Sequence, residues 1–356
     1  MCQHCRNPLH CFVPPDVTDR LAKSKDKKIR DIALETLKVS TEARTMRFMT
    51  QLMPAMSAIP SPSQSKYRLV YDMNERQFPI PGKLIREEGG PASNDPAVEE
   101  AYEFSGITYD FYKEIFGRNS LDGNGMQLIS SVHFGHNVQN AFWNGFQMIY
   151  GDGDGQIFLR FTKSLDVVAH ELTHGVTTHT SNLIYQDQPG ALNESFSDVM
   201  SAICSQWLQK QDFKDADWLM GDELLGPALE GTGVRAFRVF DAGKAYEDNP
   251  ILGTDRQPKH MRDLYTGSDD NGGVHINSGI PNHAFYKVAE ALNGYSWEAP
   301  GLIWYQTLLA LHQTSDFDHC ARTSVGVARG KYGIGSREEA AVIEGWQAVG
   351  LLEAGV

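Results

Sequence analysis

The sequence predicts an α+β protein with a β-rich N-terminal lobe, an α-helical C-terminal lobe and a short helical head in front of both. Three observations support this order. Residues 16–53 carry apolar side chains at helical spacing among charged ones. Residues 67–150 hold short strand-like segments between turns rich in Gly, Asn and Asp. From residue 164 almost to the end, the apolar residues follow a helical spacing. A length of 356 residues is enough for about two domains.

The head is separated from the rest by a linker. Pro14-Pro15 is a stiff, extended dipeptide directly before the helical pattern. Residues 53–65 contain three prolines, four serines and no charge, which is typical of an exposed linker that a protease can reach. We therefore expect a helical head over residues 1–55, a β-rich lobe over 56–185 that ends in the helix of 164–181, and a helical lobe over 186–356.

Turn signals and periodicity place the individual elements. Strands are predicted at 67–73, 126–134 and 146–150. Helices are predicted at 164–181, 191–209, 281–293, 300–313, 316–330 and 336–350, with a glycine-rich break at 266–281. The run Gly151–Gly155 is interpreted as a hairpin turn, because Gln156 and Ile157 stand where an EF-hand calcium loop needs Asp and Gly.

The charge of the chain limits its functional classes. The net charge is −13, and it is uneven, because residues 1–55 carry +4 and the rest carry −17. An acidic chain argues against nucleic-acid binding, and a basic head on an acidic body suggests that the two parts dock on each other. The longest charge-free apolar run, residues 299–315, is too polar to insert into a membrane.

The N-terminus and the cysteines bear on the compartment. Charges at Arg6, Asp16 and Asp19 and the lack of an apolar stretch argue against a Sec signal peptide. We therefore expect a protein that is cytoplasmic when made and is secreted, if at all, by a non-classical route. Five cysteines, three of them among the first eleven residues, are not the pattern of a disulfide-stapled secreted domain.

The segment His170-Glu171-Leu-Thr-His174 carries the clearest chemistry. Two histidines four residues apart project from the same face of a helix, where both imidazoles can bind one Zn²⁺ at about 2.0–2.1 Å. Glu171 lies a little farther around the helix, close enough to act as a base without being a ligand. The pattern predicts a zinc-dependent hydrolytic site, against the plainer alternative of surface histidines on a helix.

A third ligand is predicted on the next helix. Catalytic zinc takes three protein ligands and keeps one open position. Gly190 allows the chain to reverse, and antiparallel packing of residues 191–209 on the first helix would bring Glu194 to the metal. Asp198, one turn later, would accept the ring N–H of a ligating histidine. A separate loop, residues 269–279, places His275 between glycines with a carboxylate five residues earlier to orient its ring, although such loops often have no function.

Together these residues resemble the thermolysin-like zinc metallopeptidases over the stretch from about residue 78 to 350. Six blocks match in the family's order: Asn140-Ala-Phe-Trp-Asn-Gly, Gly151–Gly155, His170–His174, Leu183-Ile-Tyr-Gln, Asn193–Asp198 and Asp270–Ile280. The short head with Pro14-Pro15, the linker and the missing signal peptide are most similar to the protealysin-like branch. The resemblance implies a two-lobed fold with the zinc cleft between the lobes.

The resemblance also implies roles by position. His170, His174 and Glu194 would bind one catalytic zinc ion, and Glu171 would be the general base and later the proton donor. Asp198 would brace His170, and Asn193 would brace His174. Tyr185 and His275 would stabilise the oxyanion, with Asp270 orienting His275. Asn140 and Ala141 would pair with the substrate backbone, and Arg238, with Arg235 as the alternative, would bind a substrate carbonyl. An apolar S1′ pocket would be lined by Phe158, Phe161, Val167 and Phe237, each of which could equally be a plain core residue.

Calcium is a weaker expectation. Relatives bind structural calcium through acidic residues near the zinc helices, and Asp166, Asp217 and Asp222 fall at such positions. Ser205 and Leu219 stand where two further acidic residues are expected. Because Ca²⁺ takes 6–8 oxygen ligands, the sequence argues against a double calcium site and leaves a single weak one open.

The predicted function is a zinc-dependent endopeptidase acting on polypeptides and inhibited by its own head as a pro-segment. Pro14 and Pro15 are predicted to block the cleft, because proline lacks the N–H that productive binding needs. A second version has Cys2, Cys5 or Cys11 capping the zinc as a thiolate. Two other functional classes stay open: a separate zinc-binding module made by Cys2, His4, Cys5, His10 and Cys11, and an inactive peptide-binding protein on the same fold.

Overall fold

The head forms two helices that pack on each other. The computed structural model describes residues 11–51 and 59–352, and it describes the side chains of all of these residues except 41–51. Helix α1 spans Pro15–Leu21 and α2 spans Lys27–Gln51, where one helix over 16–53 was predicted. The break arises at Asp26, whose side chain accepts the N–H groups of Lys28 and Ile29 and so starts a new helix.

The N-terminal lobe contains a five-stranded sheet with the order β2-β1-β3-β5-β4. Strand β1 pairs in parallel with β3, and β3 with β5, whereas β2 and β4 are antiparallel edge strands. The strands are β1 Arg68–Asp72, β2 Lys83–Glu87, β3 Leu128–Val132, β4 Ala141–Trp143 and β5 Met148–Tyr150. The three predicted strands are confirmed, and the two edge strands were not predicted.

A long helix behind the sheet was also not predicted. Helix α3 spans Pro96–Phe116 and packs against β1, β3 and the first zinc-motif helix. Asp95 accepts the N–H of Ala97, Pro96 is the first helical residue, and Gly117 ends the helix with φ +69°. These are ordinary capping signals.

The turn after β5 does not make a hairpin. Gly151–Gly155 reverses the chain, but Phe158 then pairs with Leu225 in a single bridge and not with β5. Asp154 accepts the N–H groups of Gln156 and Ile157 and so closes the turn on itself. The predicted hairpin is therefore wrong, although the turn is present.

The C-terminal lobe is helical, as predicted. Helix α4, Leu165–Thr178, ends the N-terminal lobe, and the helices of the C-terminal lobe are α5 Asp187–Gln209, α6 Asp270–Asn277, α7 Gly279–Leu292, α8 Ala299–Ala310, α9 Phe317–Tyr332 and α10 Arg337–Ala348. Short pieces join them: the two-stranded sheet β6 Leu219–Met220 and β7 Arg238–Val239, and the 3-10 turns η2 Phe161–Lys163, η3 Asp222–Leu224, η4 Pro227–Leu229 and η5 Met261–Asp263. The glycine-rich segment 266–281 is not one break, because a kinked helix, α6, forms within it.

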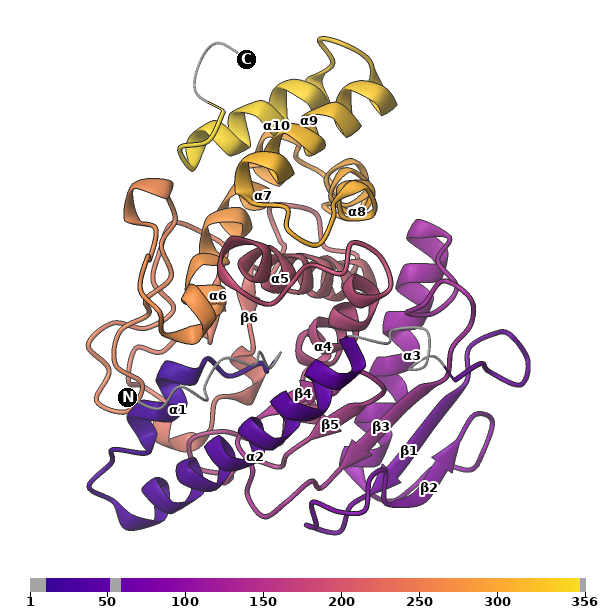
Figure 1. Ribbon diagram of the computed structural model, residues 1–356, viewed down its shortest axis with the longest axis vertical. Coiled ribbons are helices and arrows are strands. Elements are labelled where there is room, and N and C mark those ends of the chain that lie inside the picture. The colour runs from indigo at the N-terminus through magenta and orange to yellow at the C-terminus, as the bar shows by residue number, and fades with distance from the viewer. Residues whose placement is uncertain (1–10, 52–58, 353–356) are drawn as a thin grey trace.

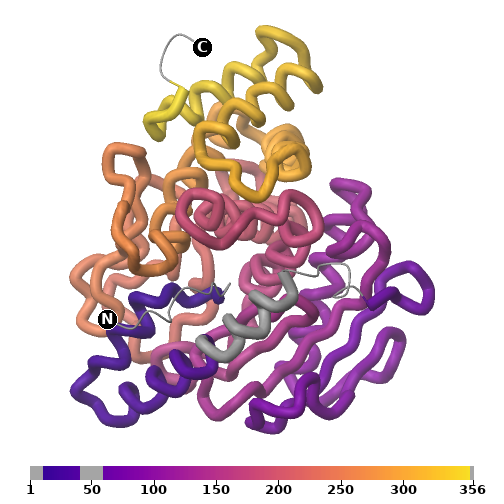
Figure 2. The backbone as a smooth tube through the Cα atoms, viewed as in Figure 1, coloured from indigo at the N-terminus to yellow at the C-terminus, as the bar shows by residue number. Residues whose placement is uncertain are grey.

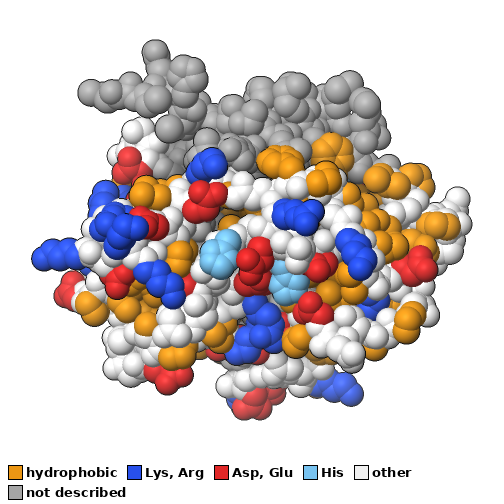
Figure 3. Space-filling model, turned by 90° about the horizontal axis from the view of Figure 1, so that it is seen from below, with side chains coloured by type: hydrophobic (Ala, Val, Ile, Leu, Met, Phe, Trp, Pro, Cys, Tyr) orange, Lys and Arg blue, Asp and Glu red, His pale blue; other side chains and the backbone are white. Residues whose placement is uncertain are grey.

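Figure 1 shows how these parts are arranged. The sheet with α3 lies on one side of the α4–α5 pair, and α7–α10 lie beyond α5 on the other. In Figure 2 the indigo tube of α1 and the first part of α2 lies at the lower left of the molecule. Helix α2 contacts the N-terminal lobe there through Thr36 and Glu35. The face seen in Figure 3 mixes basic, acidic and apolar side chains. None of the helices in the described residues is both long enough and apolar enough to cross a membrane.

Candidate active site

Three side chains from two packed helices converge on one point. His170 and His174 lie on α4 and Glu194 lies on α5, and all three are buried. The two Nε2 atoms are 3.1 Å apart, and each lies 3.4 Å from a carboxylate oxygen of Glu194. Ligands about 2.0–2.1 Å from a tetrahedral zinc ion stand roughly 3.3 Å from one another. The three donors therefore have the spacing of a zinc site.

The electrostatics of this point favour a cation. Burial disfavours a charged imidazole, yet Asp198 and Glu194 raise the pKa of His170 to about 9. The Oε2 atom of Glu194 is buried and makes no hydrogen bond, which is unusual for a carboxylate oxygen. Among the side chains described in residues 11–40 and 59–352, no other group of three or more His, Cys, Asp or Glu is close enough to share a metal ion. The donor set thus fits zinc in both chemistry and spacing.

Each histidine is held through its other ring nitrogen. Nδ1 of His170 lies 2.8 Å from Asp198 Oδ1, and Nδ1 of His174 lies 2.9 Å from Asn193 Oδ1. Partners of this kind place the proton on Nδ1 and turn the Nε2 lone pair toward the metal position. Ser197 Oγ also lies 3.0 Å from His174 Nδ1, a contact that was not predicted although Ser197 follows Asn193 by one helical turn.

Asp198 connects the metal ligands to Arg238 on β7. Its carboxylate accepts from Arg238 Nη2 at 2.8 Å and Nε at 3.0 Å, and from Asn282 Nδ2 at 2.8 Å. Burial alone would raise the pKa of Asp198, but Arg238 and His170 lower it. Arg235, the alternative to Arg238, lies at the surface in an ion pair with Asp241.

Glu171 lies on α4 next to His170 and contacts the edge strand. It is fully buried, and its Oε2 accepts the N–H of Trp143 on β4 at 3.0 Å. This bond fixes the carboxylate relative to the strand along which a peptide would pair. The predicted base and the predicted peptide-binding edge are therefore in direct contact.

A tyrosine and a second histidine lie beside the metal ligands. Tyr185 donates to Glu194, and its hydroxyl is 3.1 Å from Nε2 of His275. Asp270 holds His275 twice, with Oδ1 2.6 Å from Nδ1 and Oδ2 accepting the backbone N–H at 2.7 Å. Positive φ values at 271–273 fold the chain back so that these two residues meet. Burial opposes a charged ring, but Asp270 and Glu194 raise the pKa of His275 well above its ordinary value.

The head of the chain lies in the cleft itself. Cys11 forms an antiparallel bridge with β4, and the N–H of Phe12 donates to Ala141 O at 3.3 Å. The N–H of Val13 donates to Asn140 Oδ1 at 3.1 Å. Residues 11–13 thus add a strand to the sheet edge, which is how an extended peptide satisfies its own amides.

Two carbonyls of this segment contact groups of the site. The Cys11 carbonyl accepts from His275 Nε2 at 2.9 Å, and the Phe12 carbonyl accepts from Arg238 Nη1 at 2.8 Å. Cys11, Phe12 and Val13 were not predicted to fill the cleft. The signal that could have indicated them is an aromatic residue followed by a β-branched one just before Pro14.

The Phe12 side chain occupies an apolar pocket. Its ring is fully buried, 5.4 Å from the ring of Phe237 and 5.5 Å from that of His170, with Arg238 4.4 Å above it. Gly221 forms one wall, because a Cβ there would stand 2.6 Å from the Phe12 ring. Of the predicted pocket residues, Phe237 contacts Phe12 directly, Phe158 packs on Phe237, Phe161 packs on Phe158, and Val167 lies in the same core.

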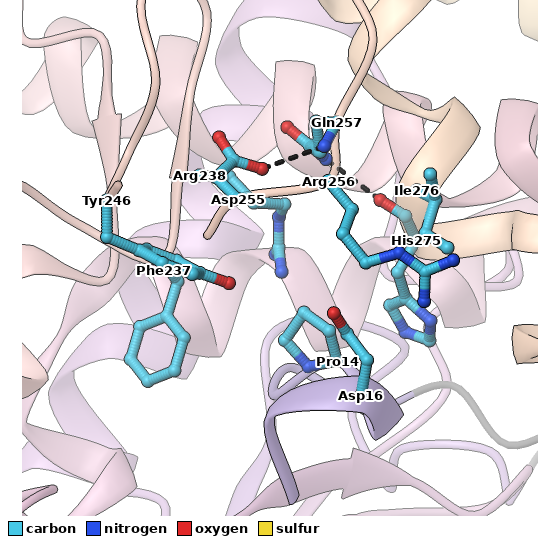
Figure 4. A pocket seen from close by; sticks show the side chains of 10 residues that line it. All are labelled: Pro14, Asp16, Phe237, Arg238, Tyr246, Asp255, Arg256, Gln257, His275 and Ile276. Atoms are coloured by element: carbon cyan, nitrogen blue, oxygen red, sulfur yellow. Dashed lines mark hydrogen bonds between the residues drawn. The ribbon is translucent and has the colours of Figure 1, made fainter. Parts of the chain in front are cut away.

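Pro14 lies beside the cleft residues Phe237, Arg238 and His275, whereas Pro15 belongs to α1. Pro15 is the first residue of α1, a position that suits proline because its missing N–H would have no helical partner. Pro14 lines a small pocket beside His275, and Asp16 points into the same pocket near Arg256 (Figure 4). Pairing with β4 needs N–H groups, which prolines lack, so the chain instead uses the residues just before them.

The Cys11 thiol does not reach the metal position. Its Sγ donates to Val13 O at 3.5 Å and lies in an apolar cluster with Val39 of α2, Phe134 and Phe142. Capping of the zinc by Cys11 is therefore wrong. The other residues of that prediction and of the separate zinc module, Cys2, His4, Cys5 and His10, lie outside the described residues.

The acidic residues predicted near calcium lie close together without forming a metal-sharing group. Burial and the charges of Asp166 and Asp217 raise the pKa of Asp222 to about 6. Asp166 is already engaged, because it accepts the N–H of Gly221 at 2.6 Å and a hydrogen bond from Ser164. The single calcium site stays a prediction.

Known proteins are similar to this chain in sequence and in fold. The family model of the thermolysin metallopeptidase catalytic domain matches residues 55–178, and that of the thermolysin metallopeptidase alpha-helical domain matches residues 181–351. An extracellular metalloprotease of Pectobacterium carotovorum subsp. carotovorum is 44% identical over 352 residues, covering 97% of each chain. A thermolysin of Alicyclobacillus acidocaldarius is 38% identical over 291 residues, 79% of this chain and 50% of that one.

A solved structure matches over nearly the full length. The precursor of protealysin, a metalloproteinase from Serratia proteamaculans, superposes with a TM-score of 0.86 at 43% identity. The match covers 96% of this chain and 99% of that chain, so it extends into the head.

Proposed function

This chain belongs to the thermolysin family of zinc metallopeptidases, and from that premise we propose that it is an endopeptidase held inactive by its own head and selective for apolar residues after the cut bond. The observation that carries this proposal is the strand formed by residues 11–13 on β4, with Phe12 in an apolar pocket. The head occupies the place that a substrate would need.

The residues of this chain divide the chemistry among themselves. His170, His174 and Glu194 would hold the zinc ion, which when bound supplies a Lewis acid that activates water and polarises a carbonyl. Glu171 takes the proton from the attacking water and passes it to the leaving amine. His275, held by Asp270, and Tyr185 donate hydrogen bonds to the oxygen on which negative charge develops, and a donor of this kind is typically worth about 3–4 kcal/mol.

Substrate binding follows the contacts of the head. Asn140 and Ala141 pair with the peptide backbone, and Arg238 binds the carbonyl of the residue after the cut bond. Asp198 and Asn193 keep the two histidines in the orientation that metal binding needs. The pocket that holds Phe12 is apolar, so it favours Leu, Ile and Phe side chains at that position.

Latency follows because head and substrate compete for the same groups. Besides the cleft contacts, Arg20 donates to Ile251 O at 3.1 Å, Gln77 donates to Glu35 at 2.8 Å, and the N–H of Gln139 donates to Thr36 at 3.1 Å. These contacts anchor α1 and α2 on the body. A substrate can bind only after the head leaves.

One assay tests the function. Full-length protein and protein lacking the head are incubated with casein and with a furylacryloyl dipeptide, with and without a zinc chelator. We expect hydrolysis by the headless protein, its loss with the chelator and its return when zinc is added. A headless, zinc-loaded protein that cuts neither substrate would contradict the proposal.

Two finer points are also proposals. Release from the cell is supported by the name of the Pectobacterium relative, an extracellular metalloprotease, and assaying the chain in culture medium and in cell extract tests it.

A single weak calcium site at Asp166, Asp217 and Asp222 would raise the melting temperature when calcium is added. A melting temperature that does not change with calcium would argue against it.

A further inference from the structure

The head lies in the cleft in the register of a substrate and places one of its own peptide bonds at the reaction centre. Under the proposed function, His275 serves the carbonyl that is attacked, and Arg238 serves the carbonyl of the following residue. In the structure these two groups bind the carbonyls of Cys11 and Phe12 respectively. The bond in the reacting position is therefore Cys11–Phe12.

The side chains agree with this register. Phe12, directly after the bond, fills the apolar pocket between Phe237 and Gly221. Cys11, directly before it, packs into a second apolar cluster with Phe142 and Val39. Neither residue is a proline, so the bond keeps the N–H and the backbone freedom that hydrolysis requires.

We infer that Cys11–Phe12 is a self-cleavage site of this chain, an inference that rests on the proposed peptidase function. Water adds to the Cys11 carbonyl carbon, a C–O bond forms and the C–N bond to Phe12 breaks. Glu171 carries one proton from the water to the departing Phe12 nitrogen. The products are a carboxylate on Cys11 and a new amino terminus on Phe12, which also takes the second proton of the water, with nothing oxidised or reduced.

This cut does not by itself free the cleft. After it, Phe12 still fills its pocket, and α1 and α2 are still held by Arg20, Glu35 and Thr36. The clipped chain therefore stays latent until the linker is also cut. Maturation then has two steps, with loss of residues 1–11 before or alongside loss of the remaining head.

The cut is intramolecular. Cys11 and Phe12 are 2% and 0% exposed in the docked state, so the active site of a second molecule has no access to the bond. The rate of this step is therefore first order and does not change when the protein is diluted.

The test is intact mass and N-terminal sequencing of full-length, zinc-loaded protein over time. We expect a species that begins at Phe12, formed at the same rate at two concentrations tenfold apart. Glu171→Gln keeps an acceptor for the Trp143 N–H but removes the base, so that chain should keep residues 1–11.

Matched substitutions at Phe12 test the register. Phe12→Leu keeps an apolar side chain and should still be cut, whereas Phe12→Asp puts a charge into the pocket and should abolish this cut. Docking is measured without catalysis in the Glu171→Gln background, where Phe12→Asp should lower the melting temperature by about 3–6 °C and Phe12→Leu by less.

The outcomes separate this inference from the proposed function. If headless protein cuts casein but full-length protein never yields a chain beginning at Phe12, the inference is wrong and the peptidase function stands. If the Phe12 species also forms from Glu171→Gln, another protease makes the cut and the inference is equally wrong. If headless protein is inactive, the proposed function itself fails.

Discussion

Among single residues, Asp198 bears on metal binding and on peptide binding at once, because one carboxylate contacts His170, Arg238 and Asn282. A histidine that binds metal needs a fixed ring orientation, and an arginine that binds a carbonyl needs a fixed orientation of its planar guanidinium group. Placing both on one buried anion ties the zinc ligand to the primed side of the cleft. A change at Asp198 would therefore affect both, so the roles are better separated at Glu171 and Arg238.

Substitution of Glu171 separates the base from the metal ligands. Glu171→Gln should keep about one zinc ion per chain and lower kcat by about 10²–10⁴-fold, since a general base is removed and no ligand is lost. His174→Ala should lose both zinc and activity. Metal analysis beside peptide hydrolysis measures this, and near-native turnover by Glu171→Gln would show that another group is the base.

Substitution of Arg238 tests the carbonyl contact. Arg238→Lys keeps the charge but cannot make the two bonds to Asp198 and a third to a peptide carbonyl, so kcat/KM of the headless enzyme should fall by about tenfold or more. The control is Arg235→Lys, which changes an exposed pair with Asp241 and should leave kcat/KM unchanged. Equal effects of the two substitutions would rule out a specific role for Arg238.

The pocket predicts the specificity of the enzyme. A well-filled apolar side chain after the cut bond should improve kcat/KM over Ala by about 1–3 kcal/mol, or roughly 5- to 150-fold. A digest of a peptide library should accordingly show Leu, Ile or Phe at that position. A preference for Asp, Glu, Lys or Arg there would contradict the assignment of the Phe12 pocket.

Among the elements, periodic helices were predictable and irregular edges were not. The predicted helices at 164–181 and 191–209 correspond to α4 and α5, and these carry the ligands, because apolar spacing was visible in the sequence. The predicted chain reversal at Gly190 is wrong, because α5 begins at Asp187 and includes Gly190. Helix α3 was missed because its buried face is rich in aromatic residues, which also favour strands, although Asp95-Pro96 and Gly117 marked its ends.

The cleft edge shows a different limit of sequence reasoning. Strand β4 has three residues, too few for a period, and its existence depends on pairing with β5 and on the Trp143–Glu171 contact. Which head residues fill the cleft depends on the register of Cys11 against β4. Register is a tertiary property. Locally, the pair Phe12-Val13 suits an extended segment, and Pro14-Pro15 marks where the strand must end.

One histidine joins three elements and makes a pH prediction. His133 follows β3, its Nε2 lies 2.8 Å from Asp95 at the start of α3, and its Nδ1 lies 2.9 Å from Asp152 in the turn after β5. Asp152 and Asp95 raise the pKa of His133 to about 9, against the opposing effect of burial. Because the folded pKa is raised above 6.5, this stabilisation is complete below pH 6.5 and is lost as pH rises through about 9.

The measurement is a difference in unfolding free energy. Between pH 6.5 and 9.5 the wild type should lose about 1–2 kcal/mol relative to His133→Gln, a value reduced from the full pKa shift because the ring is partly solvent-screened. Guanidinium unfolding in the Glu171→Gln background avoids self-digestion. Parallel curves for the two chains would mean that the charge on His133 does not stabilise the fold.

At the scale of the whole molecule, the head is held by shape and hydrogen bonds more than by charge. The uneven charge predicted electrostatic docking, but among the side chains described in residues 11–40 the ion pairs are internal to α2, Lys27–Asp31 and Lys38–Glu35. The contacts to the body are the strand on β4, the Phe12 pocket and bonds such as that of Arg20 to Ile251 O. Added salt should therefore release the head only weakly.

This mode of attachment leads to the last prediction, the maturation of the precursor. The linker of residues 53–65 carries no charge and three prolines, so it can be cut while the two lobes stay folded. Incubated wild type should yield a product of roughly 300 residues that begins within 45–65, and activity should rise with it, because loss of α1 and α2 removes the anchors of the cleft strand.

Glu171→Gln should stay uncut at the linker, and adding a trace of mature wild type should mature it if the linker cut occurs between molecules. Mass spectrometry with parallel activity assays follows both. A strand bonded to β4, His275 and Arg238 cannot share the cleft with a substrate, so an intact precursor should be inactive. A full-length wild type that stays intact and is already fully active would therefore show that the head is not inhibitory.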